Sequence, residues 1–146
     1  MRKEAEETNN MLNRPEFPLV RWGILSTAAI NEAIIRAIAM SPRSELIAVA
    51  SRTQERVDNY AEKHGIPRAY GSYDELLNDS DVDAVYVSLP NSLHAEWIVK
   101  AARAGKHVLC EKPLVIRLEE FDAVEAAARD CKVVVFEAFA NLHHPS

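Results

Sequence analysis

Residues that could bind a phosphate or move a proton follow directly after apolar segments of this sequence. The four groups of candidates lie at 26–28, 51–53, 89–94 and 111–113. They contain hydroxyl, guanidinium, imidazole and ammonium groups, which bind anions or take part in proton transfer. Because the ends of parallel strands meet at one edge of a sheet, we expect the four groups to form one site.

The first group occupies the position expected for a phosphate-binding turn but lacks the glycines of such a turn. A dinucleotide-binding turn has the pattern G-x-G-x-x-G, and the matching positions here hold Ser26, Ala28 and Asn31. Serine and alanine are small enough to let the backbone approach a pyrophosphate. Ser26 and Thr27 add hydroxyl groups beside a helix N-terminus, which favours anions. The alternative interpretation is a tight strand-to-helix turn of small residues without a ligand.

The second group indicates which dinucleotide would bind. An acidic residue about 20 positions after the first turn holds the ribose of NAD, whereas an arginine accommodates the 2′-phosphate of NADP. The segment Ala50-Ser51-Arg52-Thr53 contains no acid. Ser51 and Thr53 can donate hydrogen bonds, and the Arg52 guanidinium can bind a phosphate. These residues favour NADP over NAD, and a solvated arginine at a helix start is the alternative.

The third and fourth groups contain the residues best suited to the reacting end of a cofactor. His94 is expected in the first turn of a helix, either near a nicotinamide ring or as a capping or packing histidine. Lys112, fixed by Pro113, can direct its ammonium group at a hydroxyl or carbonyl oxygen during hydride transfer. A surface ion pair between Glu111 and Lys112 is the alternative.

The elements that must position these residues alternate between apolar strands and amphipathic helices. The predicted strands are 19–25, 45–50, 68–70, 83–89, 106–110 and 132–137. The predicted helices are 30–38, 53–64, 72–78, 92–104 and 117–130, with Ser51 or Thr53, Ser72 and Ser92 as candidate caps. Apolar strands without alternation are buried on both faces, so the order predicts an α/β fold: a Rossmann-type, doubly wound parallel sheet of about six strands.

Composition excludes several other classes of protein. The 146 residues include 17 Lys+Arg and 22 Asp+Glu, giving a net charge of −5 without basic clusters, so no nucleic-acid partner is expected. The longest apolar runs fall far short of the roughly 20 residues that span a bilayer, so no membrane association is expected. The charged N-terminus has no apolar segment behind it, and two cysteines form no disulfide framework, so we expect a cytoplasmic protein. The adjacent His143 and His144 lack further ligands, so no metal site is predicted.

The motifs together resemble the N-terminal domain of the glucose–fructose oxidoreductase/inositol 2-dehydrogenase (Gfo/Idh/MocA) family, closest to its dihydrodiol-dehydrogenase-like branch. They are Trp-Gly-Ile-Leu-Ser-Thr-Ala at 22–28, Ala-Ser-Arg at 50–52, Tyr-Gly-Ser-Tyr-Asp-Glu-Leu-Leu at 70–77, Val-Ser-Leu-Pro-Asn-Ser-Leu-His at 87–94 and Ala-Gly-Lys-His-Val-Leu-Cys-Glu-Lys-Pro at 104–113. They occur in the family's order, and the resemblance covers Val20 to Pro145.

The resemblance implies NAD(P)-dependent hydride transfer on sugars, polyols or related alcohols and ketones. It implies that Lys112 lies beside the nicotinamide and the substrate, with a cis bond before Pro113. The residues expected to line the cofactor are Ser26, Thr27, Ala28, Ile30, Ser51, Arg52, Thr53, Leu89, Pro90, Asn91, His94, Glu111 and Lys112.

The expected domain organisation is a cofactor domain without its substrate domain. Residues 1–17 are expected to form a flexible tail, 18–140 the Rossmann domain, and 141–146 the start of the passage to a substrate domain beyond residue 146. On this hypothesis the chain alone is inactive, although it can form homo-oligomers through its last strand. The alternative is a stand-alone nucleotide-binding or assembly module, and genomic sequence downstream of Ser146 would distinguish the two.

Overall fold

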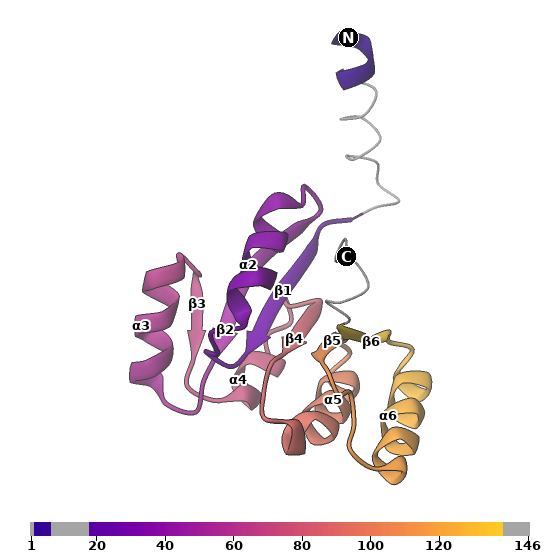
Figure 1. Cartoon of the computed structure of the whole chain (residues 1–146). Coiled ribbons are helices and arrows are strands. Elements are labelled where there is room, and N and C mark those ends of the chain that lie inside the picture. Colours follow the sequence, from indigo (N-terminus) through magenta and orange to yellow (C-terminus); the bar gives the residue numbers. More distant parts are fainter. Residues whose placement is uncertain (1, 7–17, 139–146) are drawn as a thin grey trace, which may run out of the picture.

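Six parallel strands form the single sheet of the computed structural model, which describes residues 2–6 and 18–138. The strands are β1 (Val20–Leu25), β2 (Ser44–Ala50), β3 (Arg68–Tyr70), β4 (Ala84–Val87), β5 (His107–Glu111) and β6 (Val135–Ala138). They lie in the order β3-β2-β1-β4-β5-β6, and each neighbouring pair is parallel (Figure 1). This strand order is that of a doubly wound Rossmann sheet, whose two halves meet between β1 and β4. The predicted fold class is confirmed.

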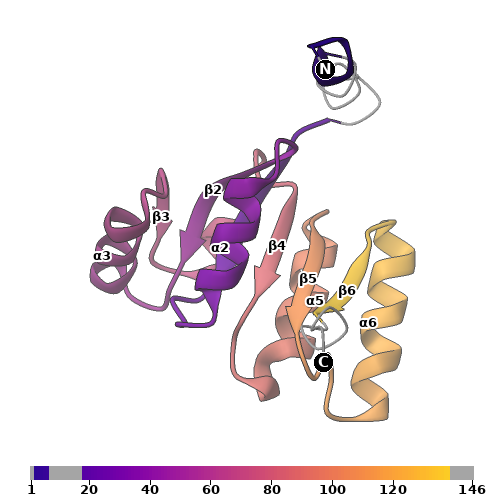
Figure 2. The same ribbon diagram turned by 45° about the horizontal axis from the view of Figure 1, so that its top comes forward.

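Helices pack on both faces of the sheet, as the apolar strands require. They are α2 (Asn31–Met40), α3 (Gln54–His64), α4 (Tyr73–Leu77), the 3-10 turn η1 (Asn91–Leu93), α5 (His94–Arg103) and α6 (Leu118–Cys131). On one face, α2 and α3 pack around a core that includes Ile24, Val49 and Val57. On the other face, α4, α5 and α6 pack around Leu25, Leu76 and Ile98 among others. Figure 2 shows that β4, β5 and β6 point the same way, so their carboxyl ends share one edge.

Local sequence signals account for where two of the helices begin and end. The Thr53 hydroxyl accepts a hydrogen bond from the Arg56 amide at 3.4 Å and caps α3, which ends at Gly65 with φ +67°. The Ser72 hydroxyl caps α4 by accepting from the Glu75 amide at 3.2 Å. Both helix starts were predictable because these polar residues precede helical periodicity.

Three predicted boundaries are wrong in ways that bear on the site. The fourth strand ends at Val87 instead of residue 89, so Ser88 and Leu89 leave the sheet. Residues 91–93 form a 3-10 turn before α5, and neither this turn nor α5 has a side-chain cap, so Ser92 is not a capping residue. The sixth strand begins at Val135 because Lys132, at φ +55°, ends α6 in the left-handed conformation.

The sheet is not covered equally on both faces along its whole width. The core on the α2 and α3 face extends to Tyr86 and to half-buried Leu109, but Phe136 of β6 is 65% exposed. Val134, just before β6, is 47% exposed. Within residues 18–138, therefore, no helix covers the β6 end of this face, and this exposure is the one from which self-association through the last strand is predicted.

The chain ends fall largely outside the described residues. Residues 2–6 form a short exposed helix, and residues 1 and 7–17 of the expected tail lie outside the described part of the chain. The expected passage at 141–146, with His143 and His144, is likewise outside, so these domain boundaries stay predictions. In the two described ranges, the helices are too short or too polar to cross a membrane.

Candidate functional site

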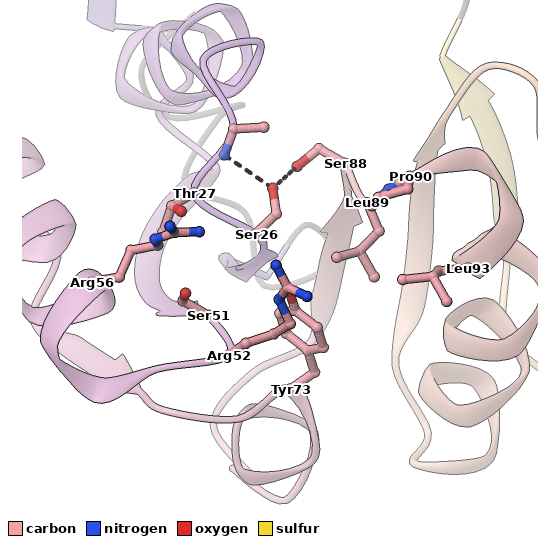
Figure 3. Close-up of a pocket in the computed structure, with 11 residues that line it drawn as sticks. Ser26, Thr27, Ser51, Arg52, Arg56, Tyr73, Ser88, Leu89, Pro90 and Leu93 are labelled. Carbon is pink, nitrogen blue, oxygen red and sulfur yellow. Dashed lines mark hydrogen bonds between the residues drawn. The ribbon is translucent and has the colours of Figure 1, made fainter.

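A cleft of about 280 Å³ opens where the carboxyl ends of β1, β2 and β4 meet. Its lining consists of Ser26, Thr27, Ala28, Ser51, Arg52, Arg56, Tyr73, Ser88, Leu89, Pro90 and Leu93 (Figure 3). The strand order reverses between β1 and β4, and open α/β sheets bind their ligands at such a point. The cleft brings together most of the first two predicted groups and the start of the third.

The floor of the cleft is a turn with an unusual backbone conformation at Ser26. Its φ is +134°, a region that glycine adopts freely and other residues rarely adopt. Glycine is the usual residue at this first position of a phosphate-binding turn. The structure therefore keeps the backbone shape of a glycine turn while carrying a serine side chain.

Hydrogen bonds from buried and half-buried side chains hold this turn. The Ala28 amide donates to Ser26 Oγ at 3.2 Å, and Ser26 Oγ lies 2.5 Å from Ser88 Oγ. The Ser88 hydroxyl donates to Asn31 Oδ1 at 2.5 Å, which leaves Ser26 Oγ as the donor to Ser88. Asn31 Nδ2 then donates to the Ser26 carbonyl at 3.1 Å. These bonds form a closed ring among Ser26, Ser88 and Asn31, which we call the polar triad. Two of its members, Ser26 and Asn31, stand at positions where the G-x-G-x-x-G pattern has glycine.

One wall of the cleft carries two positive charges. Arg52 and Arg56 line it together with buried Ser51, and Figure 3 shows Arg52 beside the Tyr73 ring. Burial raises the pKa of the Tyr73 phenol above its usual value, and the nearby charges of Arg52 and Arg56 oppose that rise. The wall can therefore bind an anion beside an aromatic ring.

The opposite wall is apolar and comes from the segment between β4 and α5. Leu89, Pro90 and Leu93 face the cleft from this side (Figure 3). Leu89 is almost fully buried, whereas Pro90 is exposed. The cleft thus presents an anion-binding wall, a helix N-terminus at its floor and an apolar wall, which together fit a dinucleotide.

His94 lies behind the apolar wall instead of at the surface of the cleft. It is fully buried, with Nε2 at 2.7 Å from the Leu89 carbonyl oxygen and Nδ1 at 2.7 Å from the Pro113 carbonyl oxygen. This geometry favours the packing interpretation that the sequence left open. It does not place the ring against a ligand.

Glu111 and Lys112 occupy the end of β5, at the same edge of the sheet. The Tyr86 hydroxyl donates to Glu111 Oε1, and burial followed by the Glu111 charge raises the pKa of Tyr86. Lys112 is exposed, and the bond between Lys112 and Pro113 is cis, as the resemblance implied. Glu111 and Lys112, both in the described range, do not form the surface ion pair that was the alternative interpretation, and the Glu111 carboxylate instead accepts from Tyr86.

The remaining predicted residues lie at or beyond the rim. Ile30 is 52% exposed at the start of α2, and Asn91 is exposed in η1. Thr53 borders a shallow hollow beside Arg56, and its hydroxyl is occupied by capping α3. The roles of all the predicted site residues in binding stay predictions.

Three residues of the lining lie outside the four predicted groups: Arg56, Tyr73 and Ser88. Arg56 could have been found, because it lies in the first turn of a helix whose cap, Thr53, was recognised. The others become part of the cleft only through the folding of distant segments. Within the described ranges, no group of three or more His, Cys, Asp or Glu residues could hold a metal ion.

The fold and the cleft define a dinucleotide-binding Rossmann domain. The sequence profile of the Gfo/Idh/MocA oxidoreductase family, described as having an NAD-binding Rossmann fold, matches residues 20–139. The chain belongs to this family, as the sequence motifs predicted.

Individual relatives agree with this assignment. The chain is 45% identical over 124 residues to a D-xylose 1-dehydrogenase (NADP(+)) of Haloferax volcanii, covering 85% of this chain and 38% of that protein. It is 39% identical over 127 residues to a trans-1,2-dihydrobenzene-1,2-diol dehydrogenase of Xenopus laevis, covering 86% and 38%. A crystal structure of a 3-ketoreductase from Actinomadura kijaniata with NADP and TDP-benzene superposes with a TM-score of 0.81 at 42% identity, covering 88% of this chain and 39% of that one. The chain thus spans about 38% of the length of these curated relatives.

Proposed function

We propose that this chain is the NADP-binding part of an oxidoreductase that transfers hydride to or from a sugar, polyol or related alcohol or ketone. The observation that carries the proposal is the pair of arginines on one wall of the cleft. Arg52 and Arg56 both line it, and residues 50–53 contain no carboxylate that could pair with the ribose hydroxyls of NAD. The names of the relatives, which include NADP-dependent sugar enzymes, support the same choice.

The residues of the cleft suit the successive parts of the cofactor. Arg52, Arg56 and Ser51 would hold the 2′-phosphate, because guanidinium groups bind phosphate with charge-assisted hydrogen bonds. The turn at Ser26–Ala28 and the N-terminus of α2 would hold the pyrophosphate. The apolar wall at Leu89 and Pro90 would exclude water beside the nicotinamide. When bound, the cofactor supplies the hydride or accepts it.

Lys112 is the residue that we propose acts on the substrate in the complete enzyme. Its ammonium group is exposed at the carboxyl edge of the sheet, on the same side as the cleft. A positive charge at this position would stabilise the oxygen of the substrate as negative charge develops on it. The substrate must also be held from its other side, because orientation of both reactants is needed for hydride transfer.

Calorimetric titration of NADPH and NADH tests the proposal directly. We expect wild-type chain to prefer NADPH by about tenfold, since charge-assisted bonds of roughly 1.5–3 kcal/mol are weakened by exposure. Arg52→Ala and Arg56→Ala should each reduce this preference, mainly by weakening NADPH binding. The matched control is Arg129→Ala on α6, where a side chain 71% exposed is removed with the same change of charge.

Two results would contradict the proposal. Equal affinities for NADPH and NADH in the wild type would mean that the arginines do not recognise the 2′-phosphate. An unchanged ratio in both cleft variants would mean the same. A cytoplasmic location and self-association of the chain remain separate predictions.

A further inference from the structure

The buried ring of His94 joins two loops that lie on the same side of the proposed cofactor site. One ring nitrogen contacts the carbonyl oxygen of Leu89, just after β4, and the other contacts that of Pro113, just after β5. Both distances are 2.7 Å, and the side chain has no exposed surface. One residue therefore spans the two strand ends of this half of the sheet.

The partners of His94 determine what its ring must do. A carbonyl oxygen only accepts hydrogen bonds, so a ring nitrogen that bonds to one must carry a proton. A neutral imidazole has one N–H group, and its second nitrogen would direct a lone pair at a carbonyl oxygen 2.7 Å away. In either tautomer one of the two carbonyl oxygens accepts the ring N–H, and the other lies at the same distance from the second ring nitrogen.

The two anchored loops carry residues of the site on each side of the ring. Leu89 and Pro90 form part of the apolar wall, and Pro113 directly follows Lys112. In a dinucleotide bound across a doubly wound sheet, one nucleotide lies over each half. With the arginines over the β1–β3 half, the nicotinamide would lie over the β4–β6 half, where these loops are.

We propose that His94 is a positioning residue for the nicotinamide end of the site. Its ring, in contact with the carbonyl oxygens of Leu89 and Pro113, holds the two loops at a fixed separation and so sets the apolar wall relative to Lys112. This inference rests on the proposed function, because it assigns one end of the same cofactor to these loops. It explains how a buried histidine that does not touch the ligand can still affect how the ligand binds.

A pair of ligands separates the two ends of the site. NADPH would contact both halves of the sheet, whereas 2′-phospho-ADP-ribose lacks the nicotinamide and keeps the phosphates. We expect His94→Gln to weaken NADPH binding by about tenfold, because glutamine cannot hold both loops in the same geometry, and to change 2′-phospho-ADP-ribose binding by less than about twofold. The control His64→Gln, on α3 against Tyr60, should leave both affinities unchanged. Circular dichroism is the check that each variant is folded.

A spectroscopic measurement on the wild type keeps the proposal testable if His94→Gln does not fold. In long-range ¹H–¹⁵N correlation spectra of the labelled chain, the His94 ring signals should shift when NADPH binds and stay unchanged when 2′-phospho-ADP-ribose binds. Ring signals that do not respond to NADPH would overturn the positioning role. Equal losses for the two ligands, or an unchanged NADPH affinity, would overturn the positioning role. Failure of either ligand to bind the wild type would instead refute the proposed cofactor site.

Discussion

Replacing Ser26 separately with glycine and with alanine distinguishes backbone strain from hydrogen bonding in the first turn. Both variants lose the hydroxyl that accepts from the Ala28 amide and contacts Ser88. Only alanine keeps a Cβ atom at φ +134°, where L residues are strained. The difference between the two variants therefore measures the strain, less the extra conformational entropy that glycine has in the unfolded chain, which a control substitution measures separately.

The structure sets the expected magnitudes. Loss of two partly buried hydrogen bonds should cost about 1–3 kcal/mol of unfolding free energy in Ser26→Ala. Ser26→Gly loses the same bonds, but relief of a strained φ returns about 1–2 kcal/mol, so its stability should be close to that of the wild type. Glycine should thus be the more stable variant by about 1–2 kcal/mol, the reverse of the usual preference for alanine.

Urea unfolding followed by circular dichroism measures both differences. The slopes of the transitions should agree among wild type and variants, so that the midpoints report stability alone. Ala33→Gly on the exposed face of α2 is the matched control, and there glycine should destabilise by about 0.5–1 kcal/mol. If Ser26→Ala is as stable as Ser26→Gly, the backbone at this turn is not strained and the reasoning fails.

Two further predictions concern other parts of the molecule. Burial opposes ionisation of Asp79, but hydrogen bonds from Tyr70 and Arg68 outweigh it and lower its pKa to about 2. This stabilisation, about 2 kcal/mol, is complete above about pH 5 and lost as pH falls toward 2. Asp79→Asn should lack that loss in acid-unfolding curves, and an unchanged curve would contradict the assignment. The uncovered β6 face should cause self-association, which Phe136→Lys should reduce in light scattering; a wild-type monomer at all concentrations would count against it.

The sheet was predictable because its strands are continuous apolar segments separated by capped helices. The run around Leu25 and that around Val85 have no polar alternation, which indicates strands covered on both faces. Helix α3 was also predictable, since Thr53 and Gly65 mark its two ends. Boundaries were less accurate where a backbone conformation decided them, as at Lys132, because a left-handed residue other than glycine has no sequence signature.

The site was only half predictable, for a physical reason that the polar triad illustrates. Ser26 and Thr27 could be identified because they follow a strand and precede a helix. Ser88 lies 62 residues further along the chain and reaches Ser26 only because β4 pairs with β1. Nothing in the segment around Ser88 indicates this partner, so the contact depends on sheet order. His94 is similar, since its contact with Pro113 requires β5 to lie beside β4.

The polar triad also changes what determines the shape of the turn after β1. In a turn of glycines, the conformation is permitted locally, because the absence of Cβ atoms removes the steric barrier. Here the conformation at Ser26 is held by Asn31 on α2 and by Ser88 at the end of β4. Ser88 belongs to the other half of the doubly wound sheet, the half that also carries Leu89 and the loop of Lys112. The turn and the opposite wall of the cleft therefore share one hydrogen-bonded network, so a change in the strand pairing between β1 and β4 would alter both sides of the cleft together.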